Sequence, residues 1–248
     1  MPGKHIEVSH VHTKEGTYPP IALPFSKRVE EIKRLKIDKV HIADKVHFKE
    51  NIKKKISIYE RFRGEAGEYK SRFSFGFEII DVLFAPENRY VEIYGCDIQD
   101  LGLWKKCPHA LEEVCELIEK SGGILILPHP YAWISVRDSG TRYIVKKLGY
   151  RPAIEINYSM RVFPVLNFMA RKLAEKYDLP KVYGLDGFEE PLYAALNIFP
   201  ESSLRDALRN NSITPYFSSV KPGVTFKRVA RTLHDFGCAK LTGFSKSH

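Results

Sequence analysis

The chain has 248 residues and a formal net charge of +9, with 44% hydrophobic and 28% charged residues. This composition is typical of a packed globular domain and excludes a largely disordered or collagen-like chain. No apolar run approaches the roughly 18 residues of a membrane-spanning helix, and residues 1–16 are too polar for a signal peptide, so we expect a cytoplasmic protein with no membrane partner.

Short β-branched runs alternate along the chain with longer segments of helical period. This alternation predicts a single α/β domain in which a parallel sheet is crossed over by helices. The predicted strands are residues 6–11, 39–43, 73–78, 90–94, 123–127, 153–156 and 181–185. The predicted helices between them are residues 27–35, 49–62, 110–120, 141–148 and 164–177. The link 79–89 has no helical period and contains an Ala-Pro-Glu-Asn turn, so we expect an irregular connection there.

The end of the chain differs from the rest in its charge. A helix at 202–209, N-capped by Ser202 or Ser203, and an extended segment at 214–218 are predicted first. Residues 220–248 then carry six Lys or Arg and one Asp, which is +5 of the +9 net charge. We therefore predict a barrel domain at 1–219 and a basic C-terminal helix or tail at 220–248. This tail either packs on the barrel through its apolar face or binds the backbone of a nucleic acid.

Cysteine and glutamine usage give two further expectations. Cys96, Cys107, Cys115 and Cys238 form no CxxC pair, so they favour neither a disulfide framework nor a thiolate zinc site and are expected to be buried apolar residues. A single Gln beside many Lys, Arg and Glu is the composition expected of a thermophile.

Imidazoles and carboxylates recur at the ends of the predicted strands. They are His10, His12, Asp44, Glu78, Glu92, His129, Glu155 and Asp186, with Lys45 and Asn157 beside them. Barrel enzymes build their sites at the carboxyl ends of the strands, because the loops there converge on one mouth. Three imidazoles and several carboxylates aimed at one mouth would repel one another or stay unsatisfied without a cation. The pattern therefore predicts a metal site.

The His10-Val11-His12 segment is specific by itself. A strand's period of two places both imidazoles on one face, toward the same ion. Zinc, manganese and iron all accept such mixed nitrogen and oxygen ligands, and the sequence does not choose among them.

Six short motifs follow one another in order between residues 5 and 217. They are His10-Val11-His12-Thr13, Gly76-Phe77-Glu78, Gly122-Gly123 with His129-Pro130, Ile154-Glu155-Ile156, Gly184-Leu185-Asp186 and Ala207-Leu208-Arg209. In this order and spacing they resemble the PHP (polymerase and histidinol phosphatase) superfamily. The Gly-Gly to His-Pro stretch is the most specific of them.

The resemblance implies a distorted, TIM-like (β/α)7 barrel that holds up to three metals at its mouth and hydrolyses phosphoesters. Carried over by motif, His10, His12, Glu78 and Asp186 match the ligands of a first metal. Glu78 would bridge to a second metal that His129 also binds. The remaining ligand of this second metal is usually a His, and Glu92 stands in its place. One or two divalent ions are therefore expected.

The ligands of a third metal are replaced in this chain. The family's Thr-Asp-His motif reads Ala43-Asp44-Lys45, and its Asp-x-His motif reads Asp186-Gly187-Phe188. A protonated Lys45 cannot bind a metal, but it can supply a fixed positive charge toward a phosphate, or form a salt bridge with Asp44 or Glu78. His41 and His47 flank the same strand end and are weaker candidates for ligands.

With one or two ions in place, a metal-bound hydroxide is the expected nucleophile for phosphoester hydrolysis. Phosphate requires cationic partners, and Lys45, Arg137 and Arg161 are the candidates. The leading interpretation is a metal-dependent phosphoesterase acting on a phosphorylated small molecule, a nucleotide or a nucleic-acid end. The alternative is a catalytically reduced barrel that serves as an RNA- or DNA-binding or assembly subunit. Another barrel hydrolase, such as an amidohydrolase, is less favoured because a carboxylated Lys or a later His pair is not found.

Overall fold

The computed structural model describes residues 4–16, 22–132, 134–187 and 189–218. The described residues up to Phe217 belong to one compact unit. The predicted basic tail at 220–248, Cys238 and Phe188 lie outside the described residues, so the domain boundary near residue 219 stays a prediction.

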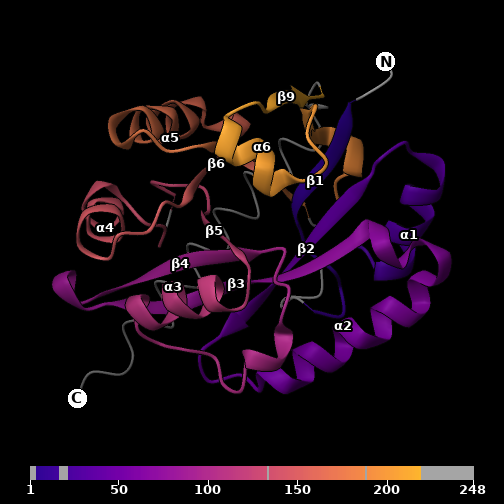
Figure 1. Ribbon diagram of the computed structural model, residues 1–248, viewed down its shortest axis with the longest axis horizontal. Coiled ribbons are helices and arrows are strands. Elements are labelled where there is room, and N and C mark those ends of the chain that lie inside the picture. The colour runs from indigo at the N-terminus through magenta and orange to yellow at the C-terminus, as the bar shows by residue number, and fades with distance from the viewer. Residues whose placement is uncertain (1–3, 17–21, 133, 188, 219–248) are drawn as a thin grey trace. The chain divides into compact units, whose positions relative to one another are not determined.

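Seven strands close into a mixed barrel with helices between them (Figure 1). In chain order they are β1 (His5–Val11), β2 (Lys39–His47), β3 (Phe73–Phe84), β4 (Arg89–Cys96), β5 (Ile124–Leu127), β6 (Ala153–Asn157) and β7 (Lys181–Gly187). Neighbours in sequence are neighbours in the sheet, and β1 closes the barrel by pairing with both β2 and β7. The distorted (β/α)7 barrel expected from the sequence is thereby confirmed.

One prediction about the sheet is wrong, because β4 runs antiparallel to both β3 and β5. The physical reason is the short link between β3 and β4: a turn at Ala85–Glu87 is followed by Asn88 in the left-handed conformation, with a φ of 46°. Two strands joined by so short a turn can only be antiparallel, whereas parallel strands need a crossover of a dozen residues or more. The expected turn at Ala-Pro-Glu-Asn is therefore present, but residues 79–84, predicted as part of the link, extend β3.

Helices cover the outside of the barrel on both sides of the view in Figure 1. They are α1 (Phe25–Arg34), α2 (Ile52–Ala66), α3 (Leu111–Lys120), α4 (Asp138–Arg142), α5 (Pro164–Tyr177) and α6 (Leu204–Asn210). Each predicted helix is present, α5 with the predicted ends and the others with shifted ends, and the one predicted at 141–148 is α4 followed by a π-helical segment, Tyr143–Lys147. Ser203 is the N-cap of α6, and its side chain accepts a hydrogen bond from the Asp206 backbone N–H.

The helices pack through apolar stripes whose spacing was visible in the sequence. The buried face of α3 consists of Leu111, Val114, Cys115 and Ile118, at intervals of three, one and three residues. On the opposite side, Phe25 of α1 stacks on Phe62 of α2 with ring centroids 4.1 Å apart. Each such buried side chain contributes about 1.5–3 kcal/mol to folding.

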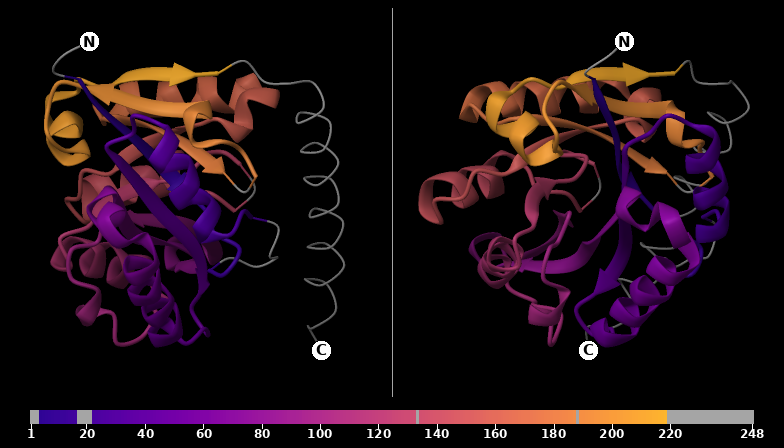
Figure 2. Two further views of the ribbon diagram at one scale, coloured as in Figure 1. Left: turned by 90° about the vertical axis from the view of Figure 1, so that its right-hand side faces the viewer. Right: turned by 45° about the vertical axis from the view of Figure 1, so that its right-hand side comes forward.

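Two further strands extend the sheet beyond the barrel. β8 (Ala195–Phe199) pairs antiparallel with the first half of β1, and β9 (Thr214–Phe217) pairs with β8 (Figure 2). The extended segment predicted at 214–218 corresponds to β9, whereas β8 was not predicted. Its five residues lie between Pro191 and Pro200 without a clear alternation, so the pattern is too short to indicate a strand.

Two expectations from composition can be checked directly. Cys96, Cys107 and Cys115 are free and buried, as predicted. In the described part of the chain, no helix is long and apolar enough to cross a membrane.

Candidate metal centre

The barrel brings together all six side chains that the sequence predicts as metal ligands. His10 lies on β1 and His12 just after it, Glu78 on β3, Glu92 on β4, His129 two residues after β5, and Asp186 on β7. Two subsets, His10–His12–Glu78 and Glu78–Glu92–His129, each place one ligand atom per residue within 4.8 Å of the others. The five residues of these subsets are buried, and Glu78 belongs to both.

Glu78 is the centre of the cluster. Its Oε1 lies 3.4 Å from His10 Nε2 and 3.2 Å from His129 Nε2. Its Oε2 lies 3.6 Å from His12 Nε2 and 3.3 Å from Lys45 Nζ. The two oxygens of this one carboxylate therefore face different groups, and Glu78 contacts all three imidazoles of the cluster.

Asp186 and Glu92 contact different imidazoles of the cluster. Asp186 Oδ1 lies 3.2 Å from His12 Nε2 and 3.9 Å from His10 Nε2. Glu92 Oε2 lies 3.7 Å from His129 Nε2. The sequence predicted Glu92 at the carboxyl end of a parallel strand. β4 instead runs antiparallel, so Glu92 joins the other candidate ligands although its strand ends elsewhere.

A second layer of hydrogen bonds fixes the orientation of the imidazoles. The Glu155 carboxylate accepts from His10 Nδ1 at 2.6 Å through Oε1, and from the backbone N–H of His129 at 2.8 Å through Oε2. Ser135 Oγ lies 2.9 Å from His129 Nδ1. These contacts occupy both Nδ1 atoms, so the Nε2 atoms of His10 and His129 remain directed at Glu78. The sequence placed Glu155 at a strand end but did not assign it this role, and Ser135 was missed because no local signal marks it.

The backbone is strained at three of the candidate ligands. His10, His129 and Asp186 have φ angles of 61°, 28° and 46°, in the region that side-chain-bearing residues rarely adopt. Such conformations cost about 1–3 kcal/mol each and cluster at functional sites. At His10 the strand is also irregular, because the register of β1 against β2 and β7 shifts between residues 8 and 11. Simple strand alternation therefore does not by itself place His10 and His12 together.

Two motif glycines are required by close packing next to the candidate ligands. A Cβ at Gly184 would overlap the Glu155 carboxylate, and a Cβ at Gly76 would overlap the Gly95 carbonyl oxygen. The absence of a side chain at Gly184 thus allows Glu155 to reach His10.

The charges of the cluster shift several pKa values. Burial lowers the pKa of His129, but its hydrogen bond to Glu78 and the neighbouring carboxylates raise that pKa to about 9. Burial raises the pKa of Glu78, but Lys45 and His10 hold it well below its ordinary value. For Glu92 burial dominates, and the pKa of its carboxyl group is raised. The carboxylates of this cluster therefore stabilise positive charge beside them.

The buried atoms of the cluster fit a divalent cation. Among the described residues, His10 Nε2, Glu78 Oε2 and Glu92 Oε2 are buried and have no hydrogen-bond partner, and the charged contacts of Glu78 Oε2 are with Lys45 and His12. An unpartnered buried polar atom costs about 1–3 kcal/mol. A mixed set of imidazole and carboxylate donors suits zinc, manganese or iron.

The remaining sequence candidates have other partners. His41 is buried, with Nε2 2.6 Å from Glu7 Oε2 and Nδ1 2.5 Å from Ser74 Oγ. His47 is half-exposed and lies 2.5 Å from Asp81 Oδ2. In the described contacts, these two histidines therefore belong to separate carboxylate pairs.

The three cations considered for phosphate binding differ in position. Lys45 pairs with Glu78, whereas the neighbouring Asp44 accepts hydrogen bonds from Thr13. Arg137 is exposed and precedes α4, and the Arg161 guanidinium lies over the rings of Tyr158 and Phe217 at 5.5 and 5.6 Å. Of these three cations, Lys45 is the one whose described ion pair is with a carboxylate of the cluster, that of Glu78.

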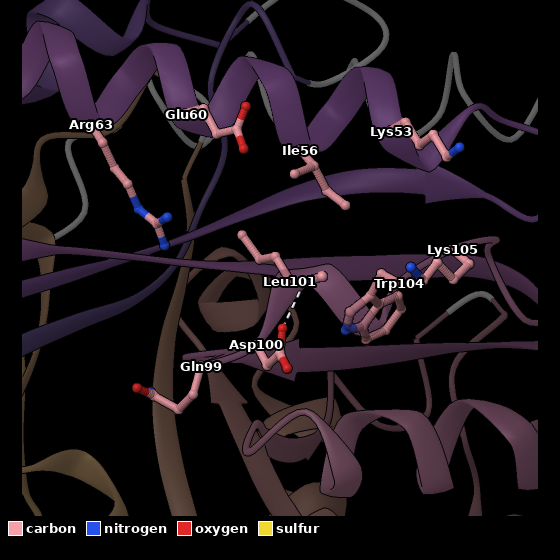
Figure 3. A pocket seen from close by; sticks show the side chains of 10 residues that line it. Lys53, Ile56, Glu60, Arg63, Gln99, Asp100, Leu101, Trp104 and Lys105 are labelled. Carbon is pink, nitrogen blue, oxygen red and sulfur yellow. Dashed lines mark hydrogen bonds between the residues drawn. The ribbon is translucent and has the colours of Figure 1, made fainter.

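An open hollow of about 410 Å³ lies elsewhere, between α2 and residues 99–105 (Figure 3). Its lining includes Lys53, Arg63 and Lys105 but none of the candidate ligands. The hollow is therefore separate from the cluster around Glu78.

Comparisons with known proteins define the fold. Neither a protein-family model nor a curated protein matches the chain. Among solved structures, the chain is similar to a two-domain protein from Bacteroides vulgatus that is described as containing a predicted PHP-like metal-dependent phosphoesterase. The match covers 92% of this chain and 70% of that protein, with 14% identity and a TM-score of 0.60. Likewise, 94% of the chain matches 99% of PsfC from Pseudomonas syringae, with 17% identity and a TM-score of 0.58. The chain thus has the barrel fold of PHP-like proteins, as its motifs indicated.

Proposed function

We propose that this chain is a metal-dependent phosphoesterase that hydrolyses a phosphorylated small molecule, a nucleotide or a nucleic-acid end. The observation that carries the proposal is the pair of buried imidazole–carboxylate groups that share Glu78. The fold supports it, since the similar protein from Bacteroides vulgatus is described as containing a PHP-like metal-dependent phosphoesterase.

The residues that would hold the metal are His10, His12 and Glu78 for one group and Glu78, Glu92 and His129 for the other. Asp186, 3.2 Å from His12, completes the first set. A divalent ion in such a site supplies Lewis-acid polarisation of a phosphoryl oxygen and lowers the pKa of water.

The chain's own residues prepare this site for a phosphate. Glu155 keeps the proton of His10 on Nδ1, so the Nε2 lone pair faces the cluster. Ser135 holds His129 in the same way. Lys45, with its side chain 25% exposed, presents an ammonium group that a phosphate oxygen can approach. Phosphate binding by Arg137 and Arg161 stays a prediction from the sequence.

The alternative of a nucleic-acid-binding or assembly subunit depends on the basic residues 220–248, which lie outside the described residues. It stays a prediction, and one experiment separates it from the enzyme. The metal content of the purified protein is measured by mass spectrometry, together with hydrolysis of p-nitrophenyl phosphate and bis(p-nitrophenyl) phosphate.

For the wild type we expect at least one tightly bound ion and activity on one of the two esters. His129→Ala should lose at least about 100-fold in activity, because a buried candidate ligand is removed. His47→Ala is the control, since it removes an imidazole that pairs with Asp81. A metal-free wild type that binds RNA with a steep salt dependence would contradict the proposal and favour the alternative.

A further inference from the structure

Lys45 is built into the cluster by the pairing of the sheet. In the parallel register of β2 and β3, Lys45 is the direct partner of Glu78. Its Nζ lies 3.3 Å from Glu78 Oε2, and the Glu78 side chain is fully buried. The same ammonium interacts electrostatically with Glu92 and Asp186. Strand pairing therefore places this lysine beside the carboxylates of the cluster.

A charge count shows what Lys45 does at this position. Four carboxylates contact the imidazoles of the cluster: those of Glu78, Glu92, Asp186 and Glu155, the last of which keeps its charge because its hydrogen-bond donors are neutral. With neutral imidazoles these four carry −4, and the ammonium reduces the sum to −3. One divalent ion then leaves −1, and a second would leave +1 beside the ammonium. Without Lys45, two divalent ions would balance the four carboxylates and leave no uncompensated charge, which is strongly unfavourable in a buried site.

The contacts of Glu78 lead to the same conclusion. A carboxylate that bridges two ions through separate oxygens presents one oxygen to each ion. Glu78 Oε1 faces His10 and His129, whereas Oε2 faces His12 and the ammonium of Lys45. A second ion at Oε2 would have to displace Lys45 from this oxygen.

We propose that Lys45 supplies the charge of a second cation, so that this centre binds one divalent ion tightly and not two. This inference rests on the proposed function in so far as it takes the cluster as a metal site. It adds to that function a centre that holds one divalent ion, with the ammonium group of Lys45 in place of a second ion.

The test is the metal stoichiometry in the absence of any substrate. Chelator-treated wild type, Lys45→Met and Lys45→Arg are dialysed against increasing Mn²⁺, and the bound metal is measured per chain. Lys45→Met keeps the length and the apolar stem of the side chain but removes its charge, whereas Lys45→Arg keeps the charge. We expect one tight ion in the wild type and in Lys45→Arg, and two in Lys45→Met, with the second ion bound at least ten-fold more tightly than in the wild type.

Two results would overturn the inference. One is a wild type that binds two ions with similar affinity, and the other is a folded Lys45→Met that still binds one ion with unchanged affinity. If Lys45→Met does not fold by circular dichroism, Lys45→Gln removes the charge while keeping hydrogen-bonding groups and answers the same question.

The outcome is distinguishable from a failure of the proposed function. If the stoichiometry changes from one to two in Lys45→Met but no phosphoester is hydrolysed, the inference stands and the phosphoesterase is wrong. If phosphoesters are hydrolysed by a wild type with two tight ions, the function stands and the role of Lys45 is wrong. A wild type that binds no divalent ion overturns both.

Discussion

Replacing Glu155 with Gln should weaken divalent-metal binding although no candidate ligand is removed. Glu155 Oε2 accepts hydrogen bonds from His129 N and from Asn157 Nδ2, and Oε1 accepts from His10 Nδ1 at 2.6 Å. The single oxygen of a Gln side chain should stay with the two donors, which directs its amide N–H₂ at His10. His10 must then accept on Nδ1 and carry its proton on Nε2, where a metal would bind.

The expected loss is about 10- to 100-fold in metal affinity, or about 1.4–2.7 kcal/mol. It should fall near the upper end of that range, because the substitution both removes a charge-assisted hydrogen bond and favours the wrong tautomer. The measurement is a Mn²⁺ or Zn²⁺ titration of chelator-treated protein by calorimetry.

Glu7→Gln is a closely matched control for this substitution. Glu7 is also a buried carboxylate, 2.6 Å from an imidazole nitrogen, but its imidazole partners are His41 and His5, which are not among the six residues of the candidate metal centre. We expect Glu7→Gln to lower the free energy of unfolding and to leave the metal affinity unchanged. The reasoning fails if Glu155→Gln binds metal within two-fold of the wild type, or if Glu7→Gln weakens binding equally.

Gly184→Ala should weaken metal binding in the same way and destabilise the fold by about 1–3 kcal/mol, because its Cβ would overlap the Glu155 carboxylate. Gly64 lies in helix α2, where an added Cβ would meet no atom within 4 Å. Gly64→Ala should therefore raise the free energy of unfolding, measured in urea, by about 0.5–1 kcal/mol. Equal effects of the two changes would refute this packing argument. Cys107 and Cys115, whose pKa values burial raises to about 12, should react with a thiol reagent at pH 8 at least about 100-fold more slowly than after unfolding. Peptide mass spectrometry measures this, and rapid labelling of either thiol in the folded protein would contradict it.

The elements of the barrel could be predicted from local patterns. β-branched runs and apolar stripes indicate strands and helices because burial of one face is a property of neighbouring residues in the sequence. The candidate ligands were recognisable for a related reason: His10, His129 and Asp186 stand in short motifs at strand ends. The direction of β4 was also implied by the short link before it, although the alternation of strands and helices suggested a parallel sheet throughout.

The sequence by itself determined the seven strands of the barrel, to within a few residues except at the end of β3, and the six side chains that form the candidate metal centre. Only the tertiary structure decided how those side chains meet. The register of β2 against β3 places Lys45 beside Glu78, and the missing side chain at Gly184 lets Glu155 orient His10 and His129. Glu155, for example, contacts His129, 26 positions earlier in the chain, and His10, 145 positions earlier. These relations depend on strand pairing and close packing, which no local pattern of residues records.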